Sequence, residues 1–330
     1  MATKIRLIWI DWMKAIGIYL IVYGHLESVA NQYVYTFSVP LFFIISGFLC
    51  KHEDDDGVFW KKLWFNLVVP MLLISCITFA IDFVIDYRNG AFELSSLYEF
   101  PVNVLLGFHE GVKQLWFVYT LIILKIVLQF TPQKVYSQAA LFVLFTVAGI
   151  LVDYYSPIVC GVNLVESSNS IINSTLAFPF FLTGFWLRKR KNELNEMHKP
   201  VAEIIVLVAC LAIVILCGKY NSLVKMYING YGDNIILFFL GGYAGTIMIF
   251  IISKWLNRFK FNGVITISKG TILILGFHMY FLIHLVRKIS AEASYMDIVW
   301  SLVVVILFIP IILFTEKYIP LLMGKYRAKS

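Results

Sequence analysis

The sequence predicts an all-α, polytopic membrane helix bundle of about ten transmembrane helices. The chain has 330 residues, of which 60% are hydrophobic, 16% aromatic and only 14% charged. Soluble domains of this length carry more charge and less apolar surface. Apolar runs recur along the whole chain, each long enough to cross a hydrocarbon core of about 30 Å. Lys and Arg are also unevenly divided between the connections, as in multi-pass membrane proteins.

Apolar runs of about 17–25 residues mark the expected spans. We place them at residues 7–26, 34–50, 63–85, 114–130, 139–155, 171–187, 201–218, 234–252, 268–286 and 297–319. Asp11 and Lys14 interrupt the first run and no small-residue cleavage site follows it, so we expect a retained helix rather than a signal peptide. In the longest connection, residues 98–108 are apolar enough to lie along the interface or re-enter the protein. One domain over residues 1–330 is therefore expected.

The positive charges predict the orientation. The two termini and the even-numbered connections carry 18 Lys and Arg residues, whereas the other connections carry six. Positive residues favour the cytoplasmic side, so both termini are predicted to be cytoplasmic, in a multi-pass protein of the inner (plasma) membrane. The net charge of +7 is mostly a topology signal. No basic groove with interleaved aromatic residues suggests nucleic-acid binding.

Lys14 and His25 lie eleven residues apart in the first span. Eleven helical steps make about 1100°, close to three turns, so both side chains share one face at a separation of about 16 Å. Ionisable groups inside a bilayer usually line a polar cavity or a substrate path, which makes this pair the candidate site. Each residue also has a structural alternative. Asp11 and Lys14 could form an ion pair at i, i+3, with the lysine side chain extending to the interface. His25 could be an ordinary histidine at the membrane interface.

Two segments of the sequence weakly resemble each other. Residues 40–49 read Pro-Leu-Phe-Phe-Ile-Ile-Ser-Gly-Phe-Leu and residues 179–187 read Pro-Phe-Phe-Leu-Thr-Gly-Phe-Trp-Leu. Each has a glycine near the predicted cytoplasmic edge, where close helix packing or the approach of a ligand favours a small residue. No fixed period supports a repeat architecture.

Several segments together resemble the family 3 integral-membrane acyltransferases. They are residues 10–14 (Ile-Asp-Trp-Met-Lys), then Gly24-His25, and the run at residues 40–49. Leu115-Trp116-Phe117, the lysine pair ahead of Pro70, and Ile-Leu-Gly-Phe-His at residues 274–278 also look like that family. The likeness is strongest to its sugar O-acetylase branch, such as fucose 4-O-acetylase-like proteins.

This resemblance implies a ten-helix enzyme that takes an acyl group from cytoplasmic acyl-CoA and delivers it to a glycan hydroxyl. The family's functional pair, a basic residue and a histidine with ten residues between them, falls on Lys14 and His25 here. Two positions depart from the pattern. The basic residue is often Arg, and Ser38-Val39 stands where the sugar-acetylase branch often has His-Met.

The chemistry of the residues is compatible with that implication. A sugar hydroxyl needs a base to attack a thioester, and histidine has the ordinary pKa closest to that task. We expect His25, Lys14 and Asp11 as the catalytic residues, with His25 as the base and the other two nearer the cytoplasm. Trp116, His278 and Ser38 are expected to bind the acceptor. The expected contacts for the CoA donor are on other helices: Lys61, Lys62, Ser46, Gly47, Arg188 and Arg190. The alternative interpretation of Arg188 and Arg190 is a topology anchor, and that of Ser46-Gly47 is a notch for helix packing.

We therefore predict a membrane O-acetyltransferase with acetyl-CoA as donor, no metal, and a polysaccharide or lipid-linked sugar as acceptor. Membrane lipid is an expected partner, and a homo-oligomer is left open. The five cysteines have no metal-binding spacing and are interpreted as small buried apolar residues. The acidic stretch at residues 52–56 is interpreted as a solvated loop. The alternatives are a glycan transporter or flippase, which would favour inverted repeats, and a non-catalytic scaffold. The sequence does not decide whether His25 acts as base or briefly carries the acyl group.

Overall fold

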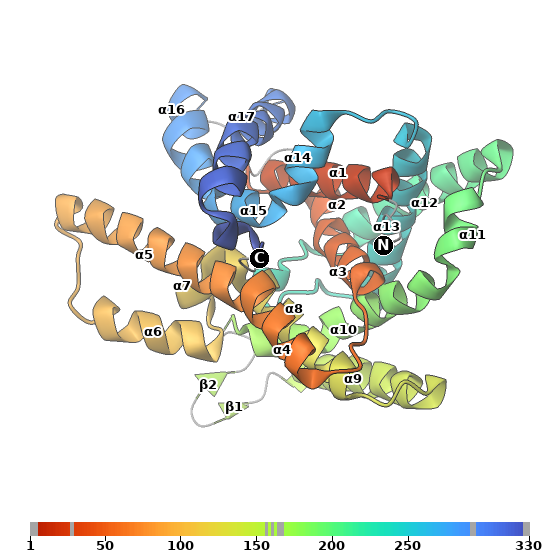
Figure 1. Ribbon diagram of the computed structural model, residues 1–330, viewed down its shortest axis with the longest axis horizontal. Coiled ribbons are helices and arrows are strands. Elements are labelled where there is room, and N and C mark those ends of the chain that lie inside the picture. Colours follow the sequence, from red (N-terminus) through yellow and green to blue (C-terminus); the bar gives the residue numbers. More distant parts are fainter. Residues whose placement is uncertain are drawn as a thin grey trace.

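The computed structural model describes residues 6–26, 30–155, 158–159, 162–163, 168–290 and 295–325, and its architecture is the predicted all-α helix bundle (Figure 1). Within this part of the chain, each of the ten predicted spans coincides with a helix. These helices are α1 (Ile8–Gly24), α3 (Ser38–Leu49), α5 (Val69–Asn89), α8 (Trp116–Phe130), α9 (Val135–Tyr155), α10 (Ser170–Leu187), α12 (Pro200–Tyr220), α13 (Ile235–Leu256), α15 (Thr271–Phe281) and α17 (Asp297–Tyr318).

Shorter elements extend or connect these helices. A π-helical turn, η1 (Trp64–Val68), joins α4 (Asp56–Leu63) to α5, so that one helix runs from Asp56 to Asn89. The others are α2 (Asn31–Tyr35), α6 (Ser96–Leu106), α7 (His109–Val112), η2 (Lys113–Leu115), η3 (Arg188–Arg190), α11 (Lys191–Glu196), η4 (Met226–Ile228), α14 (Asn262–Lys269), η5 (Leu282–Val286), α16 (Arg287–Ile289) and η6 (Pro320–Met323). A hairpin of two-residue strands, β1 (Ile158–Val159) and β2 (Val162–Asn163), is the one sheet in the described residues.

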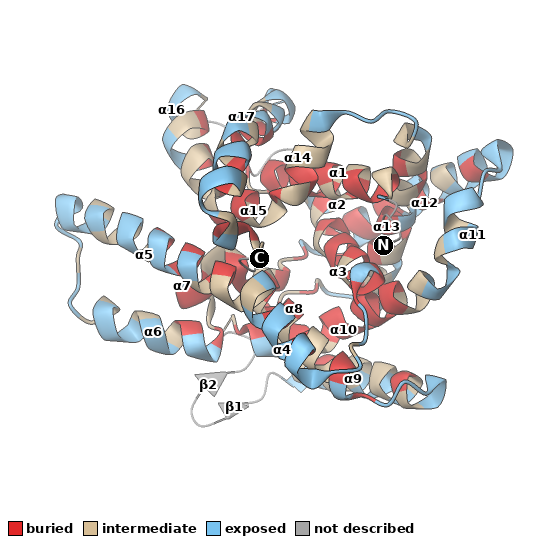
Figure 2. Cartoon of the chain, viewed as in Figure 1, coloured by how far each residue is buried: buried red, intermediate tan, exposed pale blue. Residues whose placement is uncertain are grey.

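The helices have the length and surface of membrane spans. Among the described residues, nine helical segments are long and apolar enough to cross a bilayer, while α1 is shorter, at 17 residues. The outward faces of α9, α12 and α17 are exposed and apolar, with side chains such as Leu144, Val208 and Leu313 (Figure 2). Soluble monomers rarely expose contiguous apolar faces of this kind. The chain is therefore a multi-pass membrane protein.

Contacts between connections show that alternate helix ends meet at the same side of the bundle. Where α1 begins, the backbone N–H of Trp9 donates to the side chain of Asn257, after α13, at 3.0 Å. At the opposite side, Asn169 before α10 donates to the carbonyl of Leu106 in α6 at 2.9 Å. We call these the inner and outer ends, following the predicted orientation.

The segment at residues 98–108 forms most of helix α6. Phe100 of α6 stacks on Phe79 of α5, with ring centroids 4.2 Å apart, and α6 lies along the outer half of α5 in Figure 1. Most of the helix is exposed and only Val104 is buried. The segment therefore packs on the flank of the bundle and does not enter it.

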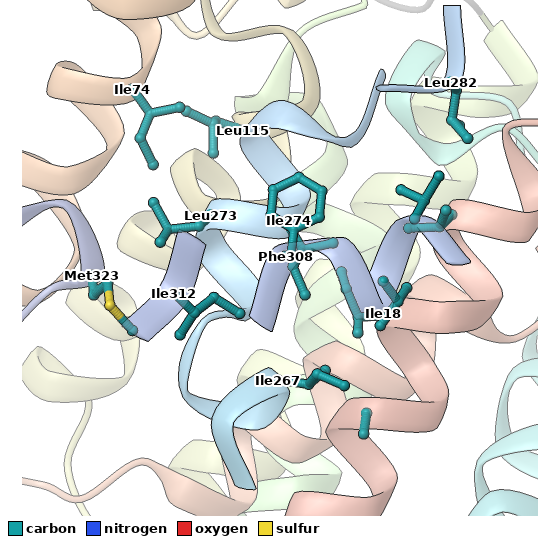
Figure 3. Packing of buried hydrophobic residues seen from close by; sticks show 14 of the residues in the cluster. Ile18, Ile74, Leu115, Ile267, Leu273, Ile274, Leu282, Phe308, Ile312 and Met323 are labelled. Carbon is teal, nitrogen blue, oxygen red and sulfur yellow. The ribbon is translucent and has the colours of Figure 1, made fainter. Parts of the chain in front are cut away.

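One apolar core lies between α1, α5, α15 and α17. Side chains from all four helices converge there, including Ile18, Ile74, Ile274 and Phe308, each at most 1% exposed (Figure 3). A second core surrounds α3, α8 and α10. Because lipid is as apolar as these side chains, close packing rather than water exclusion holds such helices together.

Helices α3 and α10 touch through their backbones. A Cβ atom on Gly47 of α3 would collide with the carbonyl of Phe181, and one on Gly184 of α10 would collide with the carbonyl of Ile44. The contact is reciprocal, because each glycine faces the residue three positions before the other. The two similar segments of the sequence are thus the two sides of one helix crossing.

The cysteines only partly fit the sequence interpretation. Cys50, Cys210 and Cys217 are buried, Cys76 is exposed on α5, and Cys160 lies outside the described residues. Cys76 faces outward because the outer surface of a membrane helix is itself apolar. The described residues contain no group of three or more His, Cys, Asp or Glu side chains that could hold a metal.

Candidate active site

His25 directly follows the last residue of α1, at the outer end. Its Nδ1 lies 2.8 Å from the carbonyl oxygen of Ile21, one turn earlier in the helix. A carbonyl only accepts hydrogen bonds, so Nδ1 of the neutral ring carries the proton and donates it. The other nitrogen, Nε2, is then the unprotonated one and can accept a proton or a hydrogen bond.

A cavity of about 560 Å³ opens beside this imidazole. Its walls come from the end of α1, from α2, from the start of α8, from α15 and from the connection between α12 and α13. The lining includes His25, Tyr35, Gln114, Trp116, Lys225 and Tyr227. The volume lies in the range of small-molecule sites, about 300–1,000 Å³. The cavity combines two histidines, His25 and His109, with aromatic and other polar groups.

His278 of α15 lies behind His25. The two ring centroids are 4.8 Å apart and the rings meet edge to face. Nδ1 of His278 lies 2.9 Å from the carbonyls of Ile274 and Leu275, so Nδ1 carries the proton, and Nε2 has no partner among the described residues. His278 is fully buried. A buried nitrogen without a partner is costly and uncommon in native structures.

The structure therefore brings His25, His278 and Trp116 together, as the sequence predicted from their depths. Trp116 begins α8 and lines the cavity. Ser38, the fourth expected residue of this region, is buried and does not line the cavity, whereas Val39 does. One residue rotates the side chain by about 100° around a helix, which explains the exchange.

Two ion pairs hold the cavity walls in place. Arg287 of α16 donates to the carbonyl of Leu26, the residue after His25, and pairs with Asp297 at 3.5 Å. Lys113, between α7 and α8, pairs with Asp82 of α5. Neither pair was predicted from the sequence, because charges at helix ends are ordinary and the partners come from distant parts of the chain.

Lys113 also adopts a strained backbone conformation. Its φ is +46° with ψ at −129°, a region that residues with a side chain rarely occupy. The next residue, Gln114, lines the cavity, and Trp116 follows two positions later. The ion pair with Asp82, which also accepts a hydrogen bond from Tyr280 at 3.0 Å, fixes the turn that presents both side chains.

Asp11 lies at the other end of α1 and is not part of the cavity. Its carboxylate accepts hydrogen bonds from Arg6 at 2.6 and 2.7 Å and from Ser268 at 2.6 Å. Both oxygens are therefore engaged, and no ion pair joins Asp11 to Lys14. Fourteen residues separate Asp11 from His25, about 21 Å along the helix. The expectation of a catalytic Asp11 is not supported, and its contacts make it an anchor for the start of α1.

Lys14 lies in the inner half of α1, and its electrostatic surroundings include a second cation, Lys125, that the sequence analysis did not single out. The charges that act on Lys14 are Asp11, Arg6 and Lys125 of α8. Lys125 and Arg188 both act on Cys50 at the end of α3. We call Lys14, Lys125 and Arg188 the inner cation cluster. Lys125 is the only charged residue between positions 114 and 130, so the rule that marked Lys14 could have found it.

The other expected donor contacts are at the inner end but are not gathered at one place. Lys61 and Lys62 are exposed on α4, where Lys62 pairs with Glu53 at 2.6 Å, and Arg190 is exposed on η3. Arg188 donates to the carbonyl of Phe48 at 3.1 Å and so lies against the end of α3.

Ser46 and Gly47 have separate surroundings. Gly47 is buried in the crossing of α3 with α10, where it allows the two backbones to touch. Ser46 is only partly buried. The structure therefore favours the packing interpretation for Gly47, because the backbone of α10 fills the space beside it.

Comparison with known proteins gives a family. No curated protein and no solved structure matches the chain. A family described as "Acyltransferase domain" matches residues 7–316. This range contains Lys14, Lys125, the two contacting histidines and every residue that lines the cavity. Because the match covers nearly the whole chain, the protein belongs to the family 3 acyltransferases.

Proposed function

We propose that this membrane acyltransferase moves an acetyl group from cytoplasmic acetyl-CoA to a hydroxyl of a cell-surface or lipid-linked glycan, in the inner membrane. One observation carries the proposal: the imidazole of His25 lines the outer cavity while its Nδ1 is tied to Ile21. This geometry leaves Nε2 as the proton acceptor. Family membership supports acyl transfer in general, and the likeness to sugar O-acetylases supports acetyl and a glycan.

The proposed reaction uses Nε2 of His25 as a general base. Nε2 takes the proton of the acceptor hydroxyl while the hydroxyl oxygen forms a bond to the thioester carbon. The carbon–sulfur bond breaks, and the imidazolium returns the proton to the sulfur, so that the products are an ester and the CoA thiol. A scheme in which Nε2 first carries the acetyl group needs the same nitrogen.

The inner cation cluster supports donor binding from the cytoplasm. Lys14 lies about 9 Å along α1 from Ile8, and Lys125 lies about 8 Å along α8 from Phe130, so the two ammonium groups are at similar depths. The phosphates of CoA would meet Arg188 and these lysines. The pantetheine arm, which spans about half of the ~30 Å core, would then carry the thioester toward His25, about 16 Å above Lys14.

The walls of the outer cavity support a sugar as acceptor. Tyr35, Trp116 and Tyr227 supply flat aromatic surface, which packs on the apolar face of a sugar ring. Asn31 and Gln114 supply amide groups that both donate and accept hydrogen bonds. Such a mixture is typical of specific small-molecule sites.

Release of CoA from labelled acetyl-CoA by the purified full-length protein tests the proposal. His25→Ala should lower the rate by about 10²–10⁴-fold, the usual contribution of a positioned general base. His284→Ala is the matched control, since His284 is exposed at the same end and does not line the cavity. It should keep the wild-type rate.

Equal turnover by His25→Ala and wild type would overturn the assigned base. Vesicles that move a labelled glycan across the membrane without releasing CoA would instead support a transporter.

A further inference from the structure

The charge in the outer cavity is one-sided. Among the described residues that line it, the ionisable side chains are His25, His109 and Lys225, and none is a carboxylic acid. The remaining polar groups are neutral amides and phenols. A cavity of this composition attracts negative charge, because low-dielectric walls concentrate the field of a lysine.

Lys225 belongs to a loop whose shape is well defined. The backbones of Lys225 and Gly230 exchange two hydrogen bonds, of 2.8 and 3.1 Å. Asn229 closes this turn with a left-handed φ of +57°. Val224 and Met226, on either side of the lysine, are 2% and 3% exposed and anchor the loop in the second core. The backbone of Lys225 is therefore fixed at the cavity wall.

A side-chain clamp fastens the same loop to α12 and α13. Asn221, at the end of α12, donates to the carbonyl of Tyr231 at 3.2 Å and accepts from the backbone of Asn234 at 2.8 Å. The hydroxyl of Tyr231 donates to Asn173 of α10 at 3.0 Å. These contacts make the loop part of the rigid bundle, so Lys225 is presented at a constant position.

The ammonium group of Lys225 has no acidic partner. Within the described chain no ion pair or side-chain hydrogen bond involves it, whereas Lys113, at the same end of the bundle, pairs with Asp82. Lys225 is partly buried at the cavity wall. An anionic ligand in the cavity could therefore make a charge-assisted contact with its ammonium group, which is stronger than a hydrogen bond between neutral groups.

We propose that the acceptor is an anionic sugar, bearing a carboxylate or phosphate near the acylated hydroxyl, and that Lys225 binds this group. This inference rests on the proposed function, since it takes the outer cavity as the acceptor site. Lysine acts as a point charge and accepts either anion, unlike arginine with its planar fork. The aromatic and amide groups bind the sugar ring, and Lys225 favours sugars that carry a negative charge.

Binding of small sugar probes to the purified full chain tests this directly. The probes are methyl glucoside, methyl glucuronide and glucose 6-phosphate, titrated by calorimetry without acetyl-CoA. At least one charged probe should bind about 10-fold more tightly than the neutral glucoside, as a charge-assisted contact provides. The comparison of glucuronide with phosphate tells which anion the cavity prefers.

Variants of the lysine separate charge from packing. Lys225→Met should remove the preference for the charged probes and leave glucoside binding unchanged, while Lys225→Arg should keep most of the preference. Lys219→Met is the matched control, because Lys219 is exposed at the outer end of α12 and does not line the cavity.

Several outcomes would overturn the inference. They are equal binding of charged and neutral probes by the wild type, no measurable binding of any probe, and a preference that survives in Lys225→Met. Failure of the proposed function would look different: a wild-type protein that does not release CoA from acetyl-CoA leaves the binding comparison intact.

Discussion

His25 takes its chemical state from its immediate neighbours. The carbonyl of Ile21 fixes which nitrogen is protonated, and the ring of His278 limits how the imidazole can turn. Both neighbours are placed by helical geometry, since Ile21 is one turn away and α15 packs against α1. His278 contacts His25 and does not line the cavity, so we interpret it as a positioning residue.

Lys125 offers a test of donor binding at the level of one side chain. If its ammonium binds a CoA phosphate, Lys125→Met should raise the KM for acetyl-CoA by about 10-fold with little change in kcat, because uniform binding is lost. Lys125→Arg should restore most of the affinity. Steady-state kinetics with varied acetyl-CoA measures both constants.

The control for this lysine is Lys134→Met, since Lys134 is exposed at the inner end. It should behave like wild type. A lower kcat with an unchanged KM in Lys125→Met would contradict a role in donor binding and indicate a role in the chemical step or in folding.

At the residue scale, sequence spacing predicted the relative positions of two side chains only where both lie on the same helix. Lys14 and His25 share a helix, so their relative positions followed from 3.6 residues per turn. Ser38 was expected at the acceptor side, but the rotation of α3 points Val39 there instead. The position of Lys225 at the cavity wall depends on how distant helices pack, which no local pattern reports.

The crossing of α3 with α10 is the closest helix contact described above. Its two glycines face backbone rather than flexible side chains, so a methyl group there has no space. This contact also places the end of α10, with Arg188, against the end of α3. The crossing therefore supports the inner cation cluster as well as the second core.

Gly184→Ala should destabilise the protein by about 1–3 kcal/mol, because the added methyl group forces the two backbones apart. Thermal unfolding in detergent should show a lower Tm than wild type. Gly263→Ala is the control, since its Cβ would meet only Ile309, at an ordinary 3.6 Å. A Tm for Gly184→Ala equal to that of the control would show that the crossing adjusts freely.

At the element scale, hydropathy located the helices but not all of their ends. The third span was predicted to begin at residue 63, yet the helix starts at Asp56, because its charged first turns extend beyond the apolar part. The ninth was predicted from residue 268, yet α14 ends at Lys269 and α15 begins at Thr271. Gly270, at this break, packs tightly on Ile312. Contacts of this kind between distant residues cannot be predicted from the spacing of apolar residues in the sequence.

The orientation of the whole bundle is a prediction from the positive charges, and single cysteines can test it. In a background with the five native cysteines replaced by serine, Lys219→Cys and Lys134→Cys place one exposed thiol at each end. A membrane-impermeant maleimide should label Lys219→Cys in intact cells and Lys134→Cys only after lysis. The reverse pattern would put the termini and the inner cation cluster outside the cell.

The global class of the molecule was the most predictable property. Composition, run length and the distribution of Lys and Arg depend on the bilayer as a solvent, which acts on every span alike. The walls of the site depend instead on long-range pairs such as Arg287 with the carbonyl of Leu26. Sequence alone could therefore give the helices and the first histidine, but not the cavity around it.

The direct backbone contact between α3 and α10 constrains how the protein can operate. Carriers alternate their access by rocking one half of the molecule against the other. Two helices whose backbones touch at glycines have little room to slide past one another. In the proposed reaction the bundle would therefore stay fixed, and the pantetheine arm of the donor would carry the acetyl group through it.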